Sequence, residues 1–136
     1  GDMRSPRIHP LFGVENRSGL SSILSGRSEA NVIQQVRDLP SLFVLPVGAI
    51  PPNPLELLER PAFGLLIREL LSKFDFVVVD TPAAVFGADA GVIAARCGAA
   101  LCIARKGKSG IGPLQDLVAN LSEGPTKLAG AILNEF

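Results

Sequence analysis

The sequence predicts an α/β fold in which a parallel β-sheet is flanked by helices. Three observations support this prediction. Short apolar segments typical of strands alternate with amphipathic segments typical of helices through most of the chain. One of these segments, Phe76–Val79, is apolar throughout, as expected of a central strand buried on both faces. Right-handed crossovers would make successive strands parallel, with their carboxyl ends at one edge of the sheet.

The first forty residues differ from the rest of the chain. Gly13, Gly19 and Gly26 separate short apolar clusters there. We expect one short helix over Gly19–Leu24 and one strand over Val32–Val36.

The regular alternation follows residue 40 and gives the order β-α-β-α-β-α-β. The segment GAIPPNP at 48–54 excludes regular structure, because its three prolines lack amide donors. Pro61 is suited to the first turn of a helix, and apolar residues recur from Phe63 to Phe74 at helical spacing. Asp89 is a suitable N-cap and Gly98 a suitable stop for the helix between them. The remaining expected elements are strands over Leu42–Leu45, Ala99–Ala104 and Leu128–Leu133, a helical turn over Leu55–Leu58, and a helix over Ile111–Leu121.

Composition limits the classes of function. The 136 residues predict a single domain spanning 1–136, and 13 basic against 13 acidic residues give no net charge to favour nucleic acid. Cys97 and Cys102 lack metal-ligand spacing and cannot form a disulfide framework, which favours a reducing, cytoplasmic setting. No apolar run reaches the length of a membrane span and no signal peptide opens the sequence, so membrane attachment is expected to come from elsewhere.

Asp80 is the most informative single residue. It directly follows the apolar segment Phe76–Val79, and ligands of open α/β sheets bind at the carboxyl ends of strands. An apolar strand ending in aspartate is the pattern of a Walker B strand, in which the carboxylate holds Mg²⁺ beside nucleotide phosphates. The alternative is that Asp80 only caps a turn with Thr81 and Pro82.

The opening residues Asp2, Met3 and Arg4 supply a second acid and a base. Two carboxylates at one sheet edge repel each other unless a divalent ion or a shared proton relieves them. Taken alone, a DxR pattern favours a solvated terminus over a functional site.

Other motifs fail. Lys106–Ser109 resembles the end of a phosphate-binding loop, but GxxxxGK[ST] requires glycine where the sequence has Cys102, so a basic loop at the edge of the site is expected. His9 is the single histidine and neither cysteine has a catalytic partner, which disfavours a zinc site or a Cys-His pair. The absence of a GxSxG elbow disfavours an α/β-hydrolase.

Four segments together resemble one family in order and spacing. They are DMRSPRIHPLFGVENRSGLSSILSGR, LPSLFVLPVGAIPPNPLELLERPAF, FDFVVVDTPAAVFGADA and AGAILNEF. The chain is similar over its length to the cytoplasmic domain of bacterial tyrosine kinases (BY-kinases) that act in exopolysaccharide and capsule biosynthesis. The resemblance implies an incomplete P-loop NTPase fold, a Rossmann-like three-layer arrangement with deviant Walker motifs of the MinD/ParA-like kind.

The resemblance also implies roles for individual residues. DMR would end the Walker A′ motif, so Asp2 would coordinate Mg²⁺ and activate the acceptor tyrosine hydroxyl, and Arg4 would be the arginine of that motif. VVVDTP would be Walker B, with Asp80 a metal ligand through water and Thr81 beside the nucleotide. Asn134 matches an asparagine expected near the adenine. The implied cofactors are ATP and Mg²⁺.

The departures from the family pattern matter equally. The Walker A loop, the first A′ aspartate and the first helix of the family are not in these residues, and no tyrosine occurs anywhere in them. We therefore expect this chain alone to be inactive and to self-associate or cover its open sheet edge. A membrane polysaccharide co-polymerase or adaptor is the expected partner, which would place the domain at the inner face of the inner membrane.

Two other functions remain open on the sequence. One is a MinD-like ATPase switch that drives partner binding, and the other is a non-catalytic regulatory module of a polysaccharide co-polymerase. The PPNP segment favours the kinase over the switch.

Overall fold

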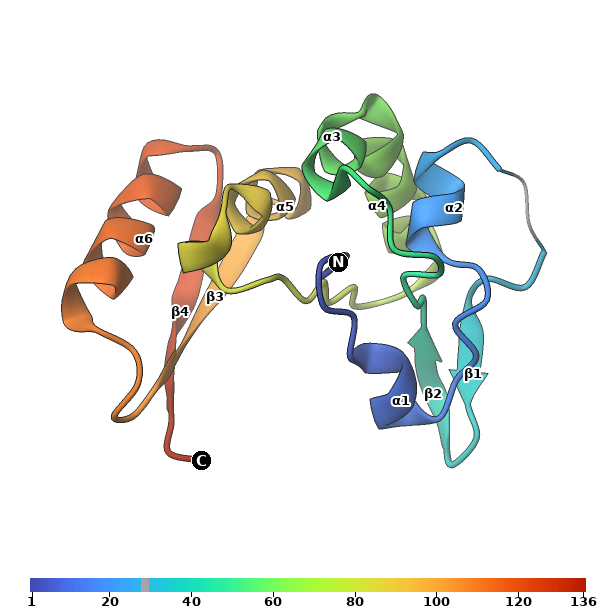
Figure 1. Ribbon diagram of the computed structural model, residues 1–136, viewed down its shortest axis with the longest axis horizontal. Helices are drawn as coiled ribbons and strands as arrows, with labels where there is room; N and C mark the ends of the chain where they lie inside the picture. The colour runs from blue at the N-terminus through green and yellow to red at the C-terminus, as the bar shows by residue number, and fades with distance from the viewer. Residues whose placement is uncertain (28–29) are drawn as a thin grey trace. The chain divides into compact units, whose positions relative to one another are not determined.

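The computed structural model describes residues 1–27 and 30–136. The chain divides into two compact units, residues 1–82 and residues 83–136 (Figure 1). Within the described residues, no helix has both the length and the apolar character needed to cross a membrane.

Three short helices carry most of the buried side chains of the first unit. The helices α2 (Leu20–Leu24), α3 (Pro54–Glu59) and α4 (Pro61–Lys73) contact one another. Both α3 and α4 begin with proline, whose missing N–H is not needed in the first turn. Their buried apolar residues are Leu20, Leu24, Leu57, Leu58, Phe63, Leu66 and Ile67. The predicted stripe of α4 is confirmed in its first half, whereas Leu71 is exposed.

A β-hairpin and a short helix complete this unit. The strands β1 (Gln34–Val36) and β2 (Leu39–Val44) pair antiparallel, and α1 (Ile8–Phe12) contacts β2. The strand expected over Leu42–Leu45 is present, but its expected place in a parallel sheet is wrong. Only Arg37 and Asp38 separate β1 from β2, and a two-residue connection can join only antiparallel strands.

Phe76–Val79 does not form the predicted buried strand. The segment has no strand assignment, and Phe76 and Val78 are 89% and 93% exposed. No strand within the described ranges pairs with it. A β-branched run is buried only when neighbouring strands satisfy its backbone groups, so the apolar pattern alone was insufficient.

The second unit is a parallel β-α-β element with one face covered. After a 3₁₀ turn η1 (Ala84–Phe86), α5 (Asp89–Cys97) leads into β3 (Ala99–Arg105), and α6 (Ile111–Glu123) connects β3 to the parallel strand β4 (Lys127–Asn134). Both helices contact β3 (Figure 1). The predicted parallel order is therefore confirmed for these two strands, but the four-stranded sheet is not seen among the described residues.

The core of this unit follows the alternation of β3. Cys102 and Ala104 are buried, whereas Leu101 and Ile103 are 52% and 66% exposed. Cys102 packs in a cluster with residues of both helices, of β4 and of β3 itself, namely Ala94, Leu121, Ala100, Leu114, Leu117, Val118 and Leu128.

The ends of α5 are close to those predicted. Gly98 ends the helix in the left-handed region at φ 80°, and its N–H bonds to the carbonyl of Ala94. Asp89 is not the N-cap, because Ala88 holds that position and Asp89 is the first helical residue, nearly fully buried.

Candidate functional site

Asp2 and Asp80, which we call the acid pair, are in contact within the first unit. The backbone N–H of Asp2 lies 3.4 Å from Oδ1 of Asp80, and the terminal amino group of Gly1 also bonds to that oxygen. The Asp80 side chain is 37% exposed. The end of the apolar segment therefore presents a carboxylate at the surface, next to the segment that carries the second acid.

A local turn holds the Asp2 carboxylate. Its Oδ1 accepts the backbone N–H groups of Arg4 and Ser5, each at 2.9 Å. This short-range acceptor pattern is typical of aspartate before a turn. The same residue therefore shapes the opening segment with its side chain and contacts Asp80 with its backbone N–H.

Residues 45–48 directly follow β2, and we call this segment the wall. Its residues Leu45, Pro46 and Val47 line a small cavity together with Asp2 and Asp80. The carbonyls of Pro46 and Val47 accept the N–H groups of Leu20 and Ser21, at 2.8 and 2.9 Å, and so satisfy the first donors of α2. Backbones approach closely here, since a Cβ on Gly19 would lie 2.0 Å from the Pro46 oxygen. Glycine at this position is therefore required for the wall to dock on α2.

Asn16 fixes the end of this wall. Its side chain brackets Gly48, with the Gly48 N–H donating to Oδ1 at 2.8 Å and Nδ2 donating to the Gly48 carbonyl at 3.2 Å. Gly48 has φ 78°, a conformation that residues with a Cβ seldom adopt.

His9 lines the same cavity as Asp2 and Asp80, although the sequence gave it no role in a site. A cavity of about 10 Å³ is lined by residues from the opening segment, from α1, from the wall and by Asp80: Gly1, Asp2, Pro6, Ile8, His9, Leu45, Pro46, Val47 and Asp80. His9 Nδ1 is buried and has no hydrogen-bond partner. Only the fold shows this relation, because a lone histidine seven residues after an aspartate fits no motif.

Two of the other predicted site residues are sequence neighbours of the acid pair, and Arg4 donates its backbone N–H to Asp2 Oδ1. Arg4 and Thr81 are both exposed, and Thr81 directly follows Asp80. Asn134 belongs to the second unit, where it ends β4. Its carbonyl accepts the N–H of Lys106 at 2.9 Å, and its Oδ1 accepts the N–H of Phe136 at 3.1 Å.

The basic loop after β3 is held by a hydrogen bond between the two residues at its ends, Arg105 and Ser109. Ser109 Oγ accepts the N–H of Arg105 at 2.9 Å, and Gly107 turns the chain with φ 72°. Lys106 pairs with Glu135 at 2.8 Å. The hydroxyl of the GKS sequence therefore serves the loop itself, in keeping with the failure of the phosphate-loop pattern.

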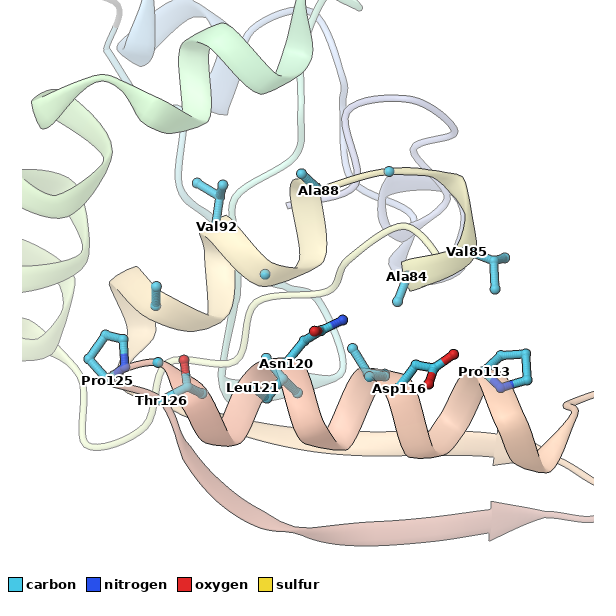
Figure 2. A pocket seen from close by; sticks show the side chains of 15 residues that line it. Ala84, Val85, Ala88, Val92, Pro113, Asp116, Asn120, Leu121, Pro125 and Thr126 are labelled. Carbon is cyan, nitrogen blue, oxygen red and sulfur yellow. The ribbon is translucent and has the colours of Figure 1, made fainter.

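The second unit has a cleft of about 530 Å³, with η1 and α5 on one side and α6 on the other. Figure 2 shows Ala88 and Val92 on one side and Pro113, Asp116 and Asn120 on the other. Small and apolar side chains line most of it. The sequence indicated both helices but gave no sign of a cleft between them.

The acid pair has the chemistry of an incomplete metal site. In the part of the chain that the structure describes, no group of three or more His, Cys, Asp or Glu side chains could hold a metal ion. Mg²⁺ commonly takes only one or two carboxylates and completes its shell with waters and substrate phosphates. Asp2 and Asp80 fit that role, because each has a second oxygen besides the one engaged by N–H donors.

Comparison with characterised proteins gives consistent relatives. No protein-family model matches the chain. The tyrosine-protein kinase wzc of Salmonella typhimurium is 32% identical over 135 residues, which cover 99% of this chain and 19% of that protein. The tyrosine-protein kinase etk of Escherichia coli is 35% identical over 133 residues, or 98% of this chain and 18% of that protein. The chain thus spans about a fifth of the length of these relatives.

Solved structures agree with the sequence relatives. The kinase domain of Escherichia coli tyrosine kinase ETK superposes with a TM-score of 0.90 at 36% identity, over 98% of this chain and 52% of that one.

Proposed function

Since the chain belongs to the family of bacterial tyrosine kinases, we propose that it forms part of an ATP-dependent protein-tyrosine kinase domain. We propose further that the whole kinase regulates exopolysaccharide polymerisation and export. The observation that carries the proposal is the meeting of Asp2 with Asp80, which follows the apolar segment. An acid pair of this kind has the composition expected of a site for Mg²⁺ and a nucleotide.

The proposed roles follow from the groups each residue offers. Asp2 and Asp80 provide hard carboxylate oxygens to Mg²⁺, which would neutralise charge on the phosphates of ATP when bound. Arg4 and Thr81 contribute a cation and a hydroxyl to the same nucleotide site. Asn134 offers an amide suited to the adenine base.

Asp2 has a second proposed role, as acceptor of a proton. In the transfer, the tyrosine oxygen forms a bond to the γ-phosphorus of ATP, and the bond from that phosphorus to the β–γ bridging oxygen breaks. ADP leaves with the electron pair, and the hydroxyl proton passes to the Asp2 carboxylate. Because Asp2 Oδ1 is already engaged by two N–H groups, Oδ2 is the oxygen available for either proposed role of Asp2.

Residues 1–136 contain no GxxxxGK[ST] loop. Backbone amides of such a loop and its lysine normally surround the β- and γ-phosphates. We therefore propose that these residues belong to one partial domain and, alone, do not turn over ATP. Their exposed apolar segment Phe76–Val79 supports pairing with further strands of the kinase or with another copy.

The proposed setting is the cytoplasmic side of the bacterial inner membrane. The family points to a membrane polysaccharide co-polymerase or adaptor domain as partner, either fused or separate. Homo-oligomerisation is proposed on the same ground. The balanced charge offers nothing to nucleic acid.

The test uses the kinase that contains this chain and three matched substitutions. Asp2→Asn and Asp80→Asn each remove one carboxylate charge, and Asp75→Asn removes a carboxylate from the other end of the apolar segment. Phosphotyrosine formation and calorimetric binding of Mg·ATP are measured for all three. We expect tyrosine phosphorylation to fall by about a hundredfold or more at Asp2 and Asp80, and to remain at the level of the unaltered kinase at Asp75. Equal activity of the Asp80 and Asp75 variants would contradict the proposal.

A further inference from the structure

His9 has a buried polar atom that the described residues do not satisfy. Its Nδ1 is shielded from solvent and makes no hydrogen bond. A buried polar group without a partner destabilises a fold, so such atoms usually bond to an ordered water. The unsatisfied nitrogen therefore indicates a bound molecule or a function.

The cavity beside His9 has the volume of a single water. It measures about 10 Å³, close to the smallest space that holds one water molecule. Both Asp2 and Asp80 line it together with His9. His9, Asp2 and Asp80 therefore lie on the lining of one small cavity.

The lining offers two carboxylates, those of Asp2 and Asp80, as second partners for a molecule in the cavity. The carbonyls of Pro46 and Val47, which also line the cavity, already accept N–H groups of α2. Asp80 Oδ1 receives the Asp2 N–H, and Oδ2 is an additional acceptor on the same group. A water molecule can donate to a carboxylate while bonding to an imidazole nitrogen in either tautomer.

We propose that His9 is a positioning residue, whose Nδ1 holds a buried water that hydrogen-bonds the Asp80 carboxylate. The water ties α1 to the end of the apolar segment and fixes the direction of the Asp80 oxygens. The histidine backbone is itself held, since its carbonyl accepts the N–H of Val14 at 3.1 Å where α1 ends. The consequence for metal binding rests on the proposed function, whereas the bridge itself does not.

Three substitutions separate hydrogen bonding from packing. His9→Phe retains a ring but has no nitrogen. His9→Asn places an amide near the position of Nδ1, and His9→Gln, of similar polarity, reaches toward the position of Nε2. If the phenylalanine variant fails to fold, the asparagine and glutamine variants still make the comparison.

The first measurement does not use activity. In the kinase labelled with ¹⁵N-histidine, the His9 signals are identified as those lost in a His9 variant. We expect the Nδ1 resonance to shift when Asp80→Asn alters the partner of the water, and to stay in place in Asp75→Asn. A crystal structure of the same protein should show a water within hydrogen-bond distance of Nδ1. An Nδ1 resonance insensitive to Asp80→Asn, or an empty cavity, overturns the proposal.

The second measurement is the Mg²⁺ concentration that gives half-maximal activity at saturating ATP. Outer partners of metal-binding side chains typically change metal affinity by 10–100-fold. We expect an increase of about tenfold for His9→Phe and His9→Gln, with values near the unaltered kinase for His9→Asn. A fall in kcat alone, with the Mg²⁺ requirement unchanged in all three variants, would show a merely structural histidine and overturn the proposal.

The two proposals fail in different ways. If Asp80→Asn leaves phosphorylation intact, the proposed function is wrong, whatever the resonance of His9 does. If Asp80→Asn abolishes phosphorylation while the His9 variants behave as the unaltered kinase, only the bridge is wrong.

Discussion

The backbone N–H of Asp2 donates a long hydrogen bond, 3.4 Å, to Oδ1 of Asp80, so that residues 78 apart in the sequence meet. The bond brings two acidic residues together where a cation is favourable. It also connects the opening segment to the end of Phe76–Val79, which pairs with no strand of the described residues. The structural and chemical roles of this contact can be tested separately.

Asp2 is expected to have a structural role that survives loss of its charge. Asp2→Asn keeps an Oδ1 acceptor for the N–H groups of Arg4 and Ser5, whereas Asp2→Ala removes it. We expect Asp2→Ala to lower the free energy of unfolding by about 1 kcal/mol and to speed amide exchange at Arg4 and Ser5. Asp2→Asn should retain both properties while losing catalysis. Equal amide protection in the two variants would show that the side chain does not hold the turn.

Gly48 is expected to tolerate no side chain. Its φ is +78° and a Cβ would lie 2.7 Å from the nitrogen of Gly19. Gly26 provides the control, since it has φ +77° but nothing within 4 Å of its Cβ position. Gly26→Ala should lower the free energy of unfolding by about 1–2 kcal/mol through backbone strain alone. Gly48→Ala should lower it by about 1–3 kcal/mol more in urea denaturation. Equal values would show that the wall can move away from α2.

The exposed segment Phe76–Val79 is expected to promote association. Val78 is 93% exposed and Leu11, outside this segment, is 73% exposed. Val78→Lys should reduce concentration-dependent association of the 136-residue chain in sedimentation velocity, because lysine on an unpaired strand opposes pairing. Leu11→Lys should have little effect. A chain that remains monomeric at high concentration without any substitution would refute this prediction.

The ion pair of Glu69 with Lys73 on α4 predicts a small pH dependence. The hydrogen bond and charge of Lys73 lower the pKa of Glu69, and the two side chains lie 2.7 Å apart. A carboxyl whose pKa is lower in the folded state stabilises the fold above its unfolded pKa. That contribution is lost as the pH falls through the lowered value.

We expect Lys73→Met to raise the Glu69 pKa toward its ordinary value in an NMR titration, and Arg68→Met on the same helix to leave it unchanged. Because this pair is exposed, its contribution to stability is expected to be small. The same pKa in the Lys73 variant and in the unaltered chain would show that the pair does not persist in solution.

Local patterns predicted those elements that are stabilised by nearby residues. The apolar spacing and Pro61 gave α4, Gly98 gave the end of α5, and the β3-α6-β4 order gave a parallel pair. The hairpin was missed because Arg37 and Asp38 do not have the glycine or asparagine typical of tight turns.

Features that depend on distant groups could not be predicted in the same way. The burial of Phe76–Val79 requires neighbouring strands, so its apolar pattern alone gave the wrong environment. Asp80 does not follow a strand, since Phe76–Val79 forms none, and its role in a metal and nucleotide site stays a prediction. Its contact with Asp2 was implied by the family resemblance rather than by spacing. His9 gave no sequence signal, because its importance lies in an unsatisfied atom and a shared cavity.

The turn at Asp2 restricts the rotation of its carboxylate. With Oδ1 held by two consecutive amides, the torsion that would exchange the two oxygens requires both hydrogen bonds to break. The two oxygens are therefore inequivalent, because one anchors the main chain and the other is not held by these amides. A lengthening of the chain between Asp2 and Ser5 by even a single residue would remove this asymmetry while leaving every side chain of the acid pair in place.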